Sequence, residues 1–119
     1  MTINWLPEPE DKNYPAAFSY LCLTWMDAPA NHLVEQLIAA PITWFKAKDI
    51  FRASGMSLLG VSNSHVEKDR KKIEAGKALS PILMVRDTAN GKVIIADGYH
   101  RLCAVYSTSE DESIPCKIV

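Results

Sequence analysis

Cysteine is scarce in this sequence of 119 residues, and the three that occur, Cys22, Cys103 and Cys116, form no C-x-x-C pair. An odd number of thiols without that spacing is a poor disulfide framework and a poor zinc site. We therefore expect reduced thiols and no protein-built metal site. Cys103 and Cys116 lie in apolar segments, so we expect both to be buried structural thiols.

Long apolar runs are absent as well. No stretch approaches the length of a membrane span, and the N-terminus shows no basic segment followed by an apolar one. Both absences lead us to expect a cytoplasmic protein with no membrane partner.

Net charge is the third thing the sequence has little of, with a total of −1 and a pI near 6.3. That balance argues against a protein that coats nucleic acid by bulk charge, and DNA is not the favoured partner. The charge is unevenly placed, because residues 1–40 carry a net −4, residues 41–109 a net +5 and residues 110–119 a net −2. An anionic partner should therefore meet the middle of the chain.

Composition and length favour one domain, since 48% hydrophobic residues in 119 positions suffice for a single core. We divide it into an N-terminal arm and helical pair over residues 1–40 and a core over residues 41–119. The arm covers residues 1–12. The first helix is expected over 16–26, deeply buried, and the second from an Asn31 cap to the stop at Pro41.

Periodicity and turn residues predict an α+β core, with a mixed sheet, a hairpin and surrounding helices. Asn90-Gly91 is a strong hairpin signal, and Pro115 marks the last strand as an edge strand. The expected segments are strand 42–46, helix 49–53 ended by Gly55, loop 57–63, helix 66–75 with a capping box at Ser64–Glu67 and an end at Gly76, strands 81–86 and 93–96, helix 100–106 and strand 114–119.

The junction Asp97-Gly98-Tyr99-His100-Arg101 lies between a buried strand and a helix. Gly98 allows a tight turn and close approach of a ligand, and the first amides of the helix lack internal partners. Arg101 can grip two phosphate oxygens and His100 can donate a further hydrogen bond. The alternative is an ordinary helix start, in which Asp97 caps the helix and Arg101 pairs locally with it. Spacing alone leaves both open.

Residues 64–119 resemble the ParB N-terminal domain and sulfiredoxin superfamily through PILMVRDTANGKVIIADGYHRLCAVY and the later IPCKIV. In order, the family shows a glycine that ends a helix, a Pro-Ile strand, a hairpin strand, a Gly-x-x-Arg turn into a helix, and Ile-Pro before the last strand. The corresponding positions here are Gly76, Pro81-Ile82, 93–96, Gly98–Arg101 and Ile114-Pro115. Residues 1–40 match nothing in that family.

The resemblance implies that the turn holds the phosphates of a nucleotide through Gly98, Tyr99, His100 and Arg101. His65 and Lys68, in the first turn of the preceding charged helix, are the further phosphate ligands we select. Asp97 and His100 are the candidate catalytic residues, with Mg²⁺ accompanying the nucleotide. Lys46 and Lys48 are weaker candidates for the same cleft. The alternative for this charged helix is that its side chains simply face solvent and bind no ligand.

Two departures from the family pattern narrow the functions that we expect of this chain. Tyr99 stands where sulfiredoxins have a reactive cysteine, so thiol repair is not expected. No Arg-rich turn and no helix-turn-helix segment are found in these residues, which counts against DNA segregation. Three hypotheses follow: a nucleotide-dependent phosphohydrolase or phosphotransferase, a non-catalytic nucleotide- or protein-binding module, and a DNA-associated ParB-like domain.

Overall fold

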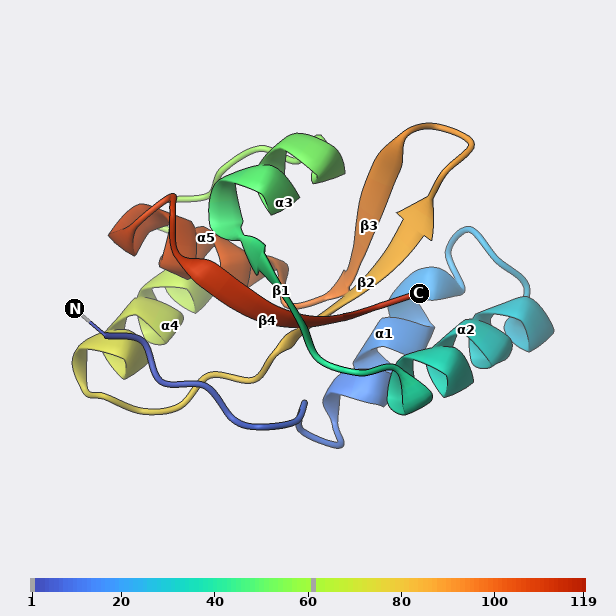
Figure 1. The fold of residues 1–119 in the computed structure, drawn as a ribbon, viewed down its shortest axis with the longest axis horizontal. Helices are drawn as coiled ribbons and strands as arrows, with labels where there is room; N and C mark the ends of the chain where they lie inside the picture. The colour runs from blue at the N-terminus through green and yellow to red at the C-terminus, as the bar shows by residue number, and fades with distance from the viewer. Residues whose placement is uncertain (1, 61) are drawn as a thin grey trace.

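A four-stranded mixed sheet runs through the middle of the molecule and carries helices on both of its faces (Figure 1). The structure is a computed structural model that describes residues 2–60 and 62–119. Five helices and four strands follow one another along this described chain, which confirms the predicted α+β class. Met1 of the predicted arm and Val61 of the predicted loop 57–63 lie outside the described residues.

The strands lie in the order β1-β4-β2-β3. β1 runs antiparallel to β4, β4 parallel to β2, and β2 antiparallel to β3. The predicted hairpin is confirmed, because β2 and β3 pair antiparallel on either side of a turn in which Gly91 has φ 64°. The bounds are β1 Thr43–Lys46, β2 Ile82–Asp87, β3 Lys92–Asp97 and β4 Ser113–Ile118.

The prediction that the last strand is an edge strand is wrong, because β4 lies between β1 and β2. Pro115 is opposite Trp44 of β1. Pairing of β4 with β2 begins one residue later, at Cys116 opposite Ile82. Pro115 therefore stands where β4 has a strand neighbour on one side only, and there a sheet tolerates a missing N–H.

The hairpin strands β2 and β3 divide the apolar core between the two faces of the sheet by simple alternation. Their side chains belong to one cluster with the helices α3 (Ala47–Ser54), α4 (Ser64–Glu74) and α5 (Tyr99–Thr108), or to a second cluster with α1 (Asn13–Leu21) and α2 (Asp27–Ala39). Ile82, Met84, Val93 and Ile95 are in the first cluster, and Leu83, Val85 and Ala96 in the second.

The first predicted helix is shorter and more exposed than expected. α1 ends at Leu21, and Leu23 and Met26, which were expected inside a buried helix, are 76% and 81% exposed. Only one stripe of α1 is buried, with Ala17 and Leu21 against the sheet. An apolar segment at the end of a helix that packs on one side has no second layer to cover its remaining face.

The second helix also starts earlier than expected, so Asn31 is not its cap. α2 begins at Asp27 with Pro29 in its first turn, where a missing N–H costs nothing. Asn31 lies inside the helix, and its amide donates to the Glu35 carboxylate one turn later at 3.1 Å.

α4 begins as predicted near Ser64, but its cap is Asn63 and not the predicted capping box. The Asn63 side chain accepts from the amides of His65 at 3.0 Å and Val66 at 3.3 Å. The helix ends at Glu74, ahead of Gly76 with φ 72°. α3 ends as predicted at Gly55, which has φ 65°.

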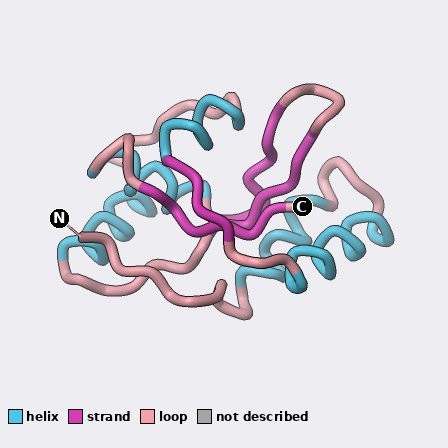
Figure 2. The backbone as a smooth tube through the Cα atoms, viewed as in Figure 1, coloured by secondary structure: helices cyan, strands magenta, loops and turns pink. Residues whose placement is uncertain are grey.

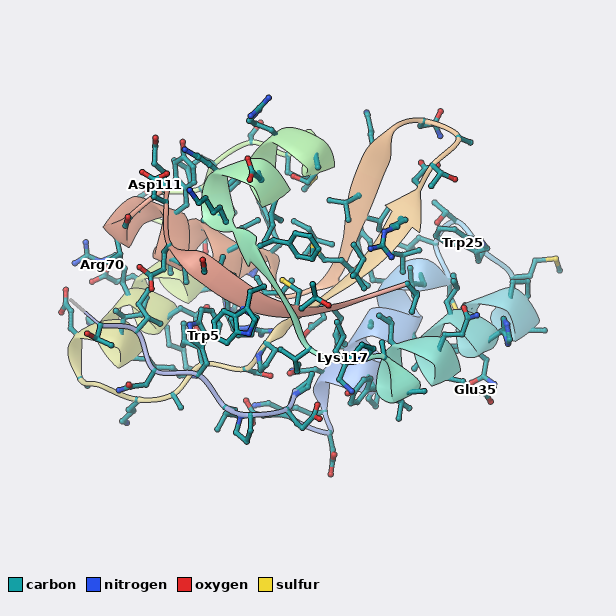
Figure 3. All side chains as sticks on the ribbon, viewed as in Figure 1. Trp5, Trp25, Glu35, Arg70, Asp111 and Lys117 are labelled. Carbon is teal, nitrogen blue, oxygen red and sulfur yellow. The ribbon has the colours of Figure 1, made fainter. Side chains whose placement is uncertain are left out.

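The N-terminal arm packs along the chain between α4 and β2. The Leu6 amide donates to the Leu79 carbonyl at 2.8 Å. Lys117 of β4, labelled in Figure 3 beside α2, is 4% exposed and donates to the Ile38 carbonyl at 2.8 Å. Its Nζ also lies 3.2 Å from the Glu8 carboxylate, so one side chain links the arm, α2 and the sheet.

Cys103 and Cys116 are both fully buried, as predicted, and burial raises the pKa of the Cys116 thiol to about 12. A thiol held protonated in this way is a poor nucleophile.

Within residues 2–60 and 62–119, no helix has both the length and the apolar character that a membrane crossing requires.

Candidate functional site

The site is built around Gly98, the single residue between β3 and α5. Gly98 has φ 107°, a backbone conformation that side chains rarely permit. A Cβ here would lie 2.9 Å from Ile82 and 2.8 Å from the Arg101 guanidinium. Glycine therefore serves two purposes, since it permits the turn and lets Arg101 fold back over the junction.

The first turn of α5 leaves backbone donors without partners. Gly98 is the N-cap, and no side chain of the described residues caps the helix, so the alternative in which Asp97 is the cap is wrong. The first helical hydrogen bond across the junction runs from Leu102 to the Gly98 carbonyl at 2.9 Å. Among the described residues, none accepts from the amides of Tyr99, His100 or Arg101. These amides stand at the positive end of α5.

Asp97 pairs with Arg101 across this turn, as the local-pairing alternative predicted. The guanidinium Nη2 is 3.0 Å from the carboxylate, and the two side chains are only 16% and 19% exposed. The same nitrogen donates to the Pro81 carbonyl at 3.3 Å. The buried Nε of Arg101 has no acceptor among the described residues. Nη2 thus anchors the guanidinium of Arg101, while Nε remains free to donate a hydrogen bond to a ligand.

α4 supplies the opposite wall of the site. Four residues of this helix, spaced three or four positions apart, lie on the side that faces α5: His65, Lys68, Asp69 and Lys72. The rings of His65 and His100 lie with centroids 4.9 Å apart at 41°. Residues more than thirty positions apart in the chain thereby meet at one place.

These two walls border a cavity of about 200 Å³, which we call the phosphate cavity after the ligand that the sequence analysis expects there. At neutral His, Lys68, Lys72 and Arg101 contribute three positive charges against two negative ones from Asp69 and Asp97. This surplus of positive charge is small, but two histidines and three free amides add hydrogen-bond donors to the cavity. Its lining is His65, Lys68, Asp69, Lys72, Asp97, Gly98, Tyr99, His100 and Arg101.

Asp69 is the carboxylate of α4 that faces this cavity. Burial raises its pKa, and the positive charges of Arg101, Lys72 and His100 act in the opposite direction. No ion pair within 4.0 Å is formed by Asp69 with any described residue. It is a half-buried acid surrounded at longer range by cations.

His100 has the reverse perturbation. Burial lowers the pKa of its imidazole, the neighbouring His65 lowers it further, and Asp69 partly offsets both effects. The ring is therefore biased toward its neutral form while the cavity holds no anion. An anion beside it reverses the balance, because opposite charge favours the protonated form.

Tyr99 contributes its backbone amide and ring to the site, but its hydroxyl is engaged elsewhere. The hydroxyl donates to the Ser57 carbonyl in the loop between α3 and α4. Burial raises the pKa of this phenol. Tyr99 therefore fastens that loop to the rim of the cavity.

A second cavity of about 420 Å³ adjoins the first and runs along the free edge of β3, and we call it the edge cavity. Ala16 and Tyr20 of α1 form one side, and Ser54 and Met56 form the other. All six residues of β3 line it, from Lys92 to Asp97. The two cavities share Asp97, Gly98, Tyr99 and His100.

The structure brings together all the residues that the sequence selected, namely Asp97, Gly98, Tyr99, His100, Arg101, His65 and Lys68. The weaker candidates are not with them, since Lys46 does not line the cavity and Lys48 pairs with Asp111 at 2.7 Å. Sequence reasoning missed Asp69 and Lys72. The signal was present, because they follow His65 and Lys68 by four residues and so share a helix face.

The cavity offers donors and charge rather than a metal cage. No group of three or more His, Cys, Asp or Glu side chains among the described residues is arranged to hold a metal ion. Comparisons with known proteins give no further guide: no family model, curated protein or solved structure matches this chain.

Proposed function

We propose that this protein binds a nucleotide, with its phosphates in the phosphate cavity, as a domain of the ParB/sulfiredoxin-like type. The observation that carries the proposal is the open first turn of α5, where three unpartnered amides meet Arg101, His100 and His65. Backbone donors at a helix start, backed by a planar guanidinium, match the oxygens of a phosphate. The order of motifs over residues 64–119 supports the same ligand class.

The edge cavity supports a nucleotide rather than a bare phosphate. Its wall is mostly apolar, with Ile94 of β3 and Met56 among its members, and it adjoins the phosphate cavity through the residues from Asp97 to His100. A small-molecule site typically combines such an apolar volume with a few convergent polar groups. A nucleoside in the edge cavity and phosphates beyond Gly98 would use both.

Mg²⁺ fits this proposal as a companion of the phosphates. Mg²⁺ is usually held by one or two carboxylates together with substrate phosphates. Asp69 is the cavity carboxylate that would reach it, since Asp97 is already paired with Arg101. The ion would neutralise charge on the phosphate oxygens.

If the protein is an enzyme, its chemistry is hydrolysis or transfer of a phosphoryl group. Arg101 and the α5 amides would stabilise charge on the phosphoryl oxygens, and the neutral form of His100 would accept a proton from the attacking hydroxyl or water. The runner-up is a non-catalytic nucleotide-binding module. The Asp97–Arg101 pair favours that reading, because it removes Asp97 as a free base.

Calorimetry with nucleoside di- and triphosphates, with and without Mg²⁺, tests the binding proposal. We expect binding by the native chain and at least a fivefold loss for Lys68→Gln, an exposed cavity residue whose exchange leaves the core intact. Lys12→Gln removes the same charge far from the cavity and should bind normally. Absence of binding to every nucleotide would overturn the proposal.

Phosphate release under the same conditions separates the enzyme from the binding module. We expect His100→Gln to lose turnover more than binding if a phosphoryl group is cleaved. Binding without release by the native chain would assign the runner-up function.

A further inference from the structure

The two sides of α4 carry their charges very differently. On one side Arg70 lies between two acids, 3.7 Å from the Glu67 carboxylate and 2.7 Å from that of Glu74. Figure 3 labels Arg70 on α4, at the end of the molecule away from β3. The two acids outweigh the one arginine, so this cluster has a net charge of −1. The acids of α4 other than Asp69 are thereby held on that side.

On the other side Lys68, Lys71 and Lys72 follow one another, and Lys77 comes just past the end of the helix. None of these four lysines forms an ion pair with a described residue, in contrast to Lys12, Lys48 and Lys117. Like charges at i,i+4, such as Lys68 and Lys72, destabilise a helix unless an anion lies between them. The unpaired row therefore favours an anionic ligand.

The lysines enclose a hollow of about 320 Å³, which we call the lysine groove, lined by Lys68, Lys71, Lys72, Ala75 and Lys77. Within the described part of the chain, no acidic side chain lines this groove. Lys68 and Lys72 also line the phosphate cavity, so the two hollows lie side by side on α4. The edge cavity adjoins the phosphate cavity at its other end, through the residues from Asp97 to His100.

We propose that the ligand extends from the phosphate cavity into the lysine groove, and that it is a single strand of nucleic acid. The inference rests on the proposed function and extends it. One nucleoside lies in the edge cavity, its phosphate lies at Gly98 to Arg101, and the phosphates of the following nucleotides lie along the outer side of α4.

The dimensions agree with a short strand. From Lys68 to Ala75 the helix advances roughly 10 Å, at about 1.5 Å per residue. A stacked strand carries one phosphate per roughly 3.4 Å, so the groove has room for about three. A duplex fits less well, because a base enters the edge cavity only when it is unpaired and unstacked. The near-neutral total charge does not oppose this, since residues 41–109 carry a net +5 and the net negative charge lies in residues 1–40 and 110–119.

The test compares a thymidine mononucleotide with fluorescently labelled oligothymidylates of increasing length, measured by titration at two salt concentrations. We expect affinity to rise with length until the groove is filled. In Lys71→Gln/Lys77→Gln that rise should largely disappear, because both side chains are exposed and line only the groove. Mononucleotide binding should be unchanged in this variant.

Salt dependence gives the size of the effect. Each single-strand phosphate contact makes the plot of log affinity against log salt concentration steeper by about 0.7, so losing two contacts reduces its downward slope by about 1.4. Between about 50 mM and about 200 mM salt the native chain should therefore lose roughly sevenfold more affinity than the double variant. Lys12→Gln/Lys46→Gln removes two lysines that line none of the three hollows and should behave like the native chain.

Each of the remaining outcomes would contradict a different part of the proposal. Equal binding of mononucleotide and oligonucleotide, or an unchanged salt slope in the lysine double variant, refutes the groove. Equal binding of a duplex refutes the single strand, and equal competition by inorganic polyphosphate refutes nucleic acid. A native chain that binds oligonucleotides but no mononucleotide contradicts the proposed function itself.

Discussion

Two strands of this sheet run directly into helices, and the two junctions are finished in different ways. Figure 2 shows β1 passing into α3 without an intervening loop, and β3 passes into α5 through one glycine. At the first junction the amides of Ala47 and Lys48 donate to the carbonyls of Glu112 and Glu110, both at 2.9 Å. The chain closes this helix start with its own backbone.

At the second junction the amides of Tyr99, His100 and Arg101 have no acceptor among the described residues. Charge differs in the same way: Lys48 lies in an exposed pair with Asp111, whereas Arg101 and Asp97 are mostly buried and border a cavity. A strand–helix junction is therefore not a binding site by virtue of its topology. It becomes a candidate when nothing in the chain satisfies its donors.

Arg101→Ala should have the largest effect, because it removes the guanidinium of the open junction. From the sequence, a ligand-facing arginine would contribute little to stability, but the pair with the mostly buried Asp97 changes that expectation. We expect the free energy of unfolding to fall by about 2–4 kcal/mol, as an unpaired carboxylate is left behind. Nucleotide affinity should fall at least about tenfold, measured by calorimetry at a temperature where the variant is folded.

Arg52→Ala is the matched control, since Arg52 of α3 is 83% exposed and 3.8 Å from Asp49. An exposed pair of this kind contributes about 0–1 kcal/mol. Equal destabilisation by the two variants would remove the contrast between the junctions.

Gly98→Ala should have the next largest effect, through backbone strain and close contacts. With φ 107° and a new Cβ only 2.9 Å from Ile82, we expect a loss of about 2–3 kcal/mol in unfolding free energy. Gly55→Ala is the comparison, because its φ is 65° and the nearest atom to its Cβ is 3.8 Å away, so about 1 kcal/mol is expected. Denaturant titration of both variants measures the difference.

The pH dependence of anion binding should follow His100. Its pKa is lowered in the ligand-free protein, below the ordinary value of 6.5, with His65, Asp69 and Arg101 facing it. The unfolded state therefore binds this proton more readily, so ligand-free stability should fall as pH drops through about 6.5. Bound sulfate favours protonation of His100. Sulfate affinity should therefore rise as the pH drops over the same range, by up to about tenfold per pH unit for one proton.

His100→Gln should flatten that profile in calorimetric titrations with sulfate between about pH 5.5 and pH 7.5. A profile that persists in the variant would assign the proton to another group of the cavity, such as His65 or Asp69.

The smallest effect is expected at the closed junction. Lys48→Gln breaks the 2.7 Å contact with Asp111, yet both side chains are exposed to solvent. The pKa of Lys48 is raised and that of Asp111 lowered by their mutual hydrogen bond and charge, so the contact exists but is screened by water and salt. Melting temperature and nucleotide affinity should both stay within error of the native values, and a drop in affinity would extend the site to β1.

Much of the fold followed from local signals. Asn90-Gly91 predicted the hairpin of β2 and β3, and Gly55 predicted the end of α3, because Gly91 and Gly55 take positive φ angles that other residues avoid. The predictions that failed depended on distant neighbours. Pro115 marked β4 as an edge strand by a correct local rule, but the register with β2 places the proline beyond the paired segment.

The sequence by itself determined a strand–glycine–helix junction with His100 and Arg101 on it, and a charged helix with His65 and Lys68 near its start. Tertiary structure decided that the two meet around one cavity, that Asp69 and Lys72 join them, and that Arg101 is paired with Asp97. It also decided that α1 and the residues after α3 flank the free edge of β3. Local preferences fix the angles of a few consecutive residues, whereas a cavity depends on which faces pack together across the whole chain.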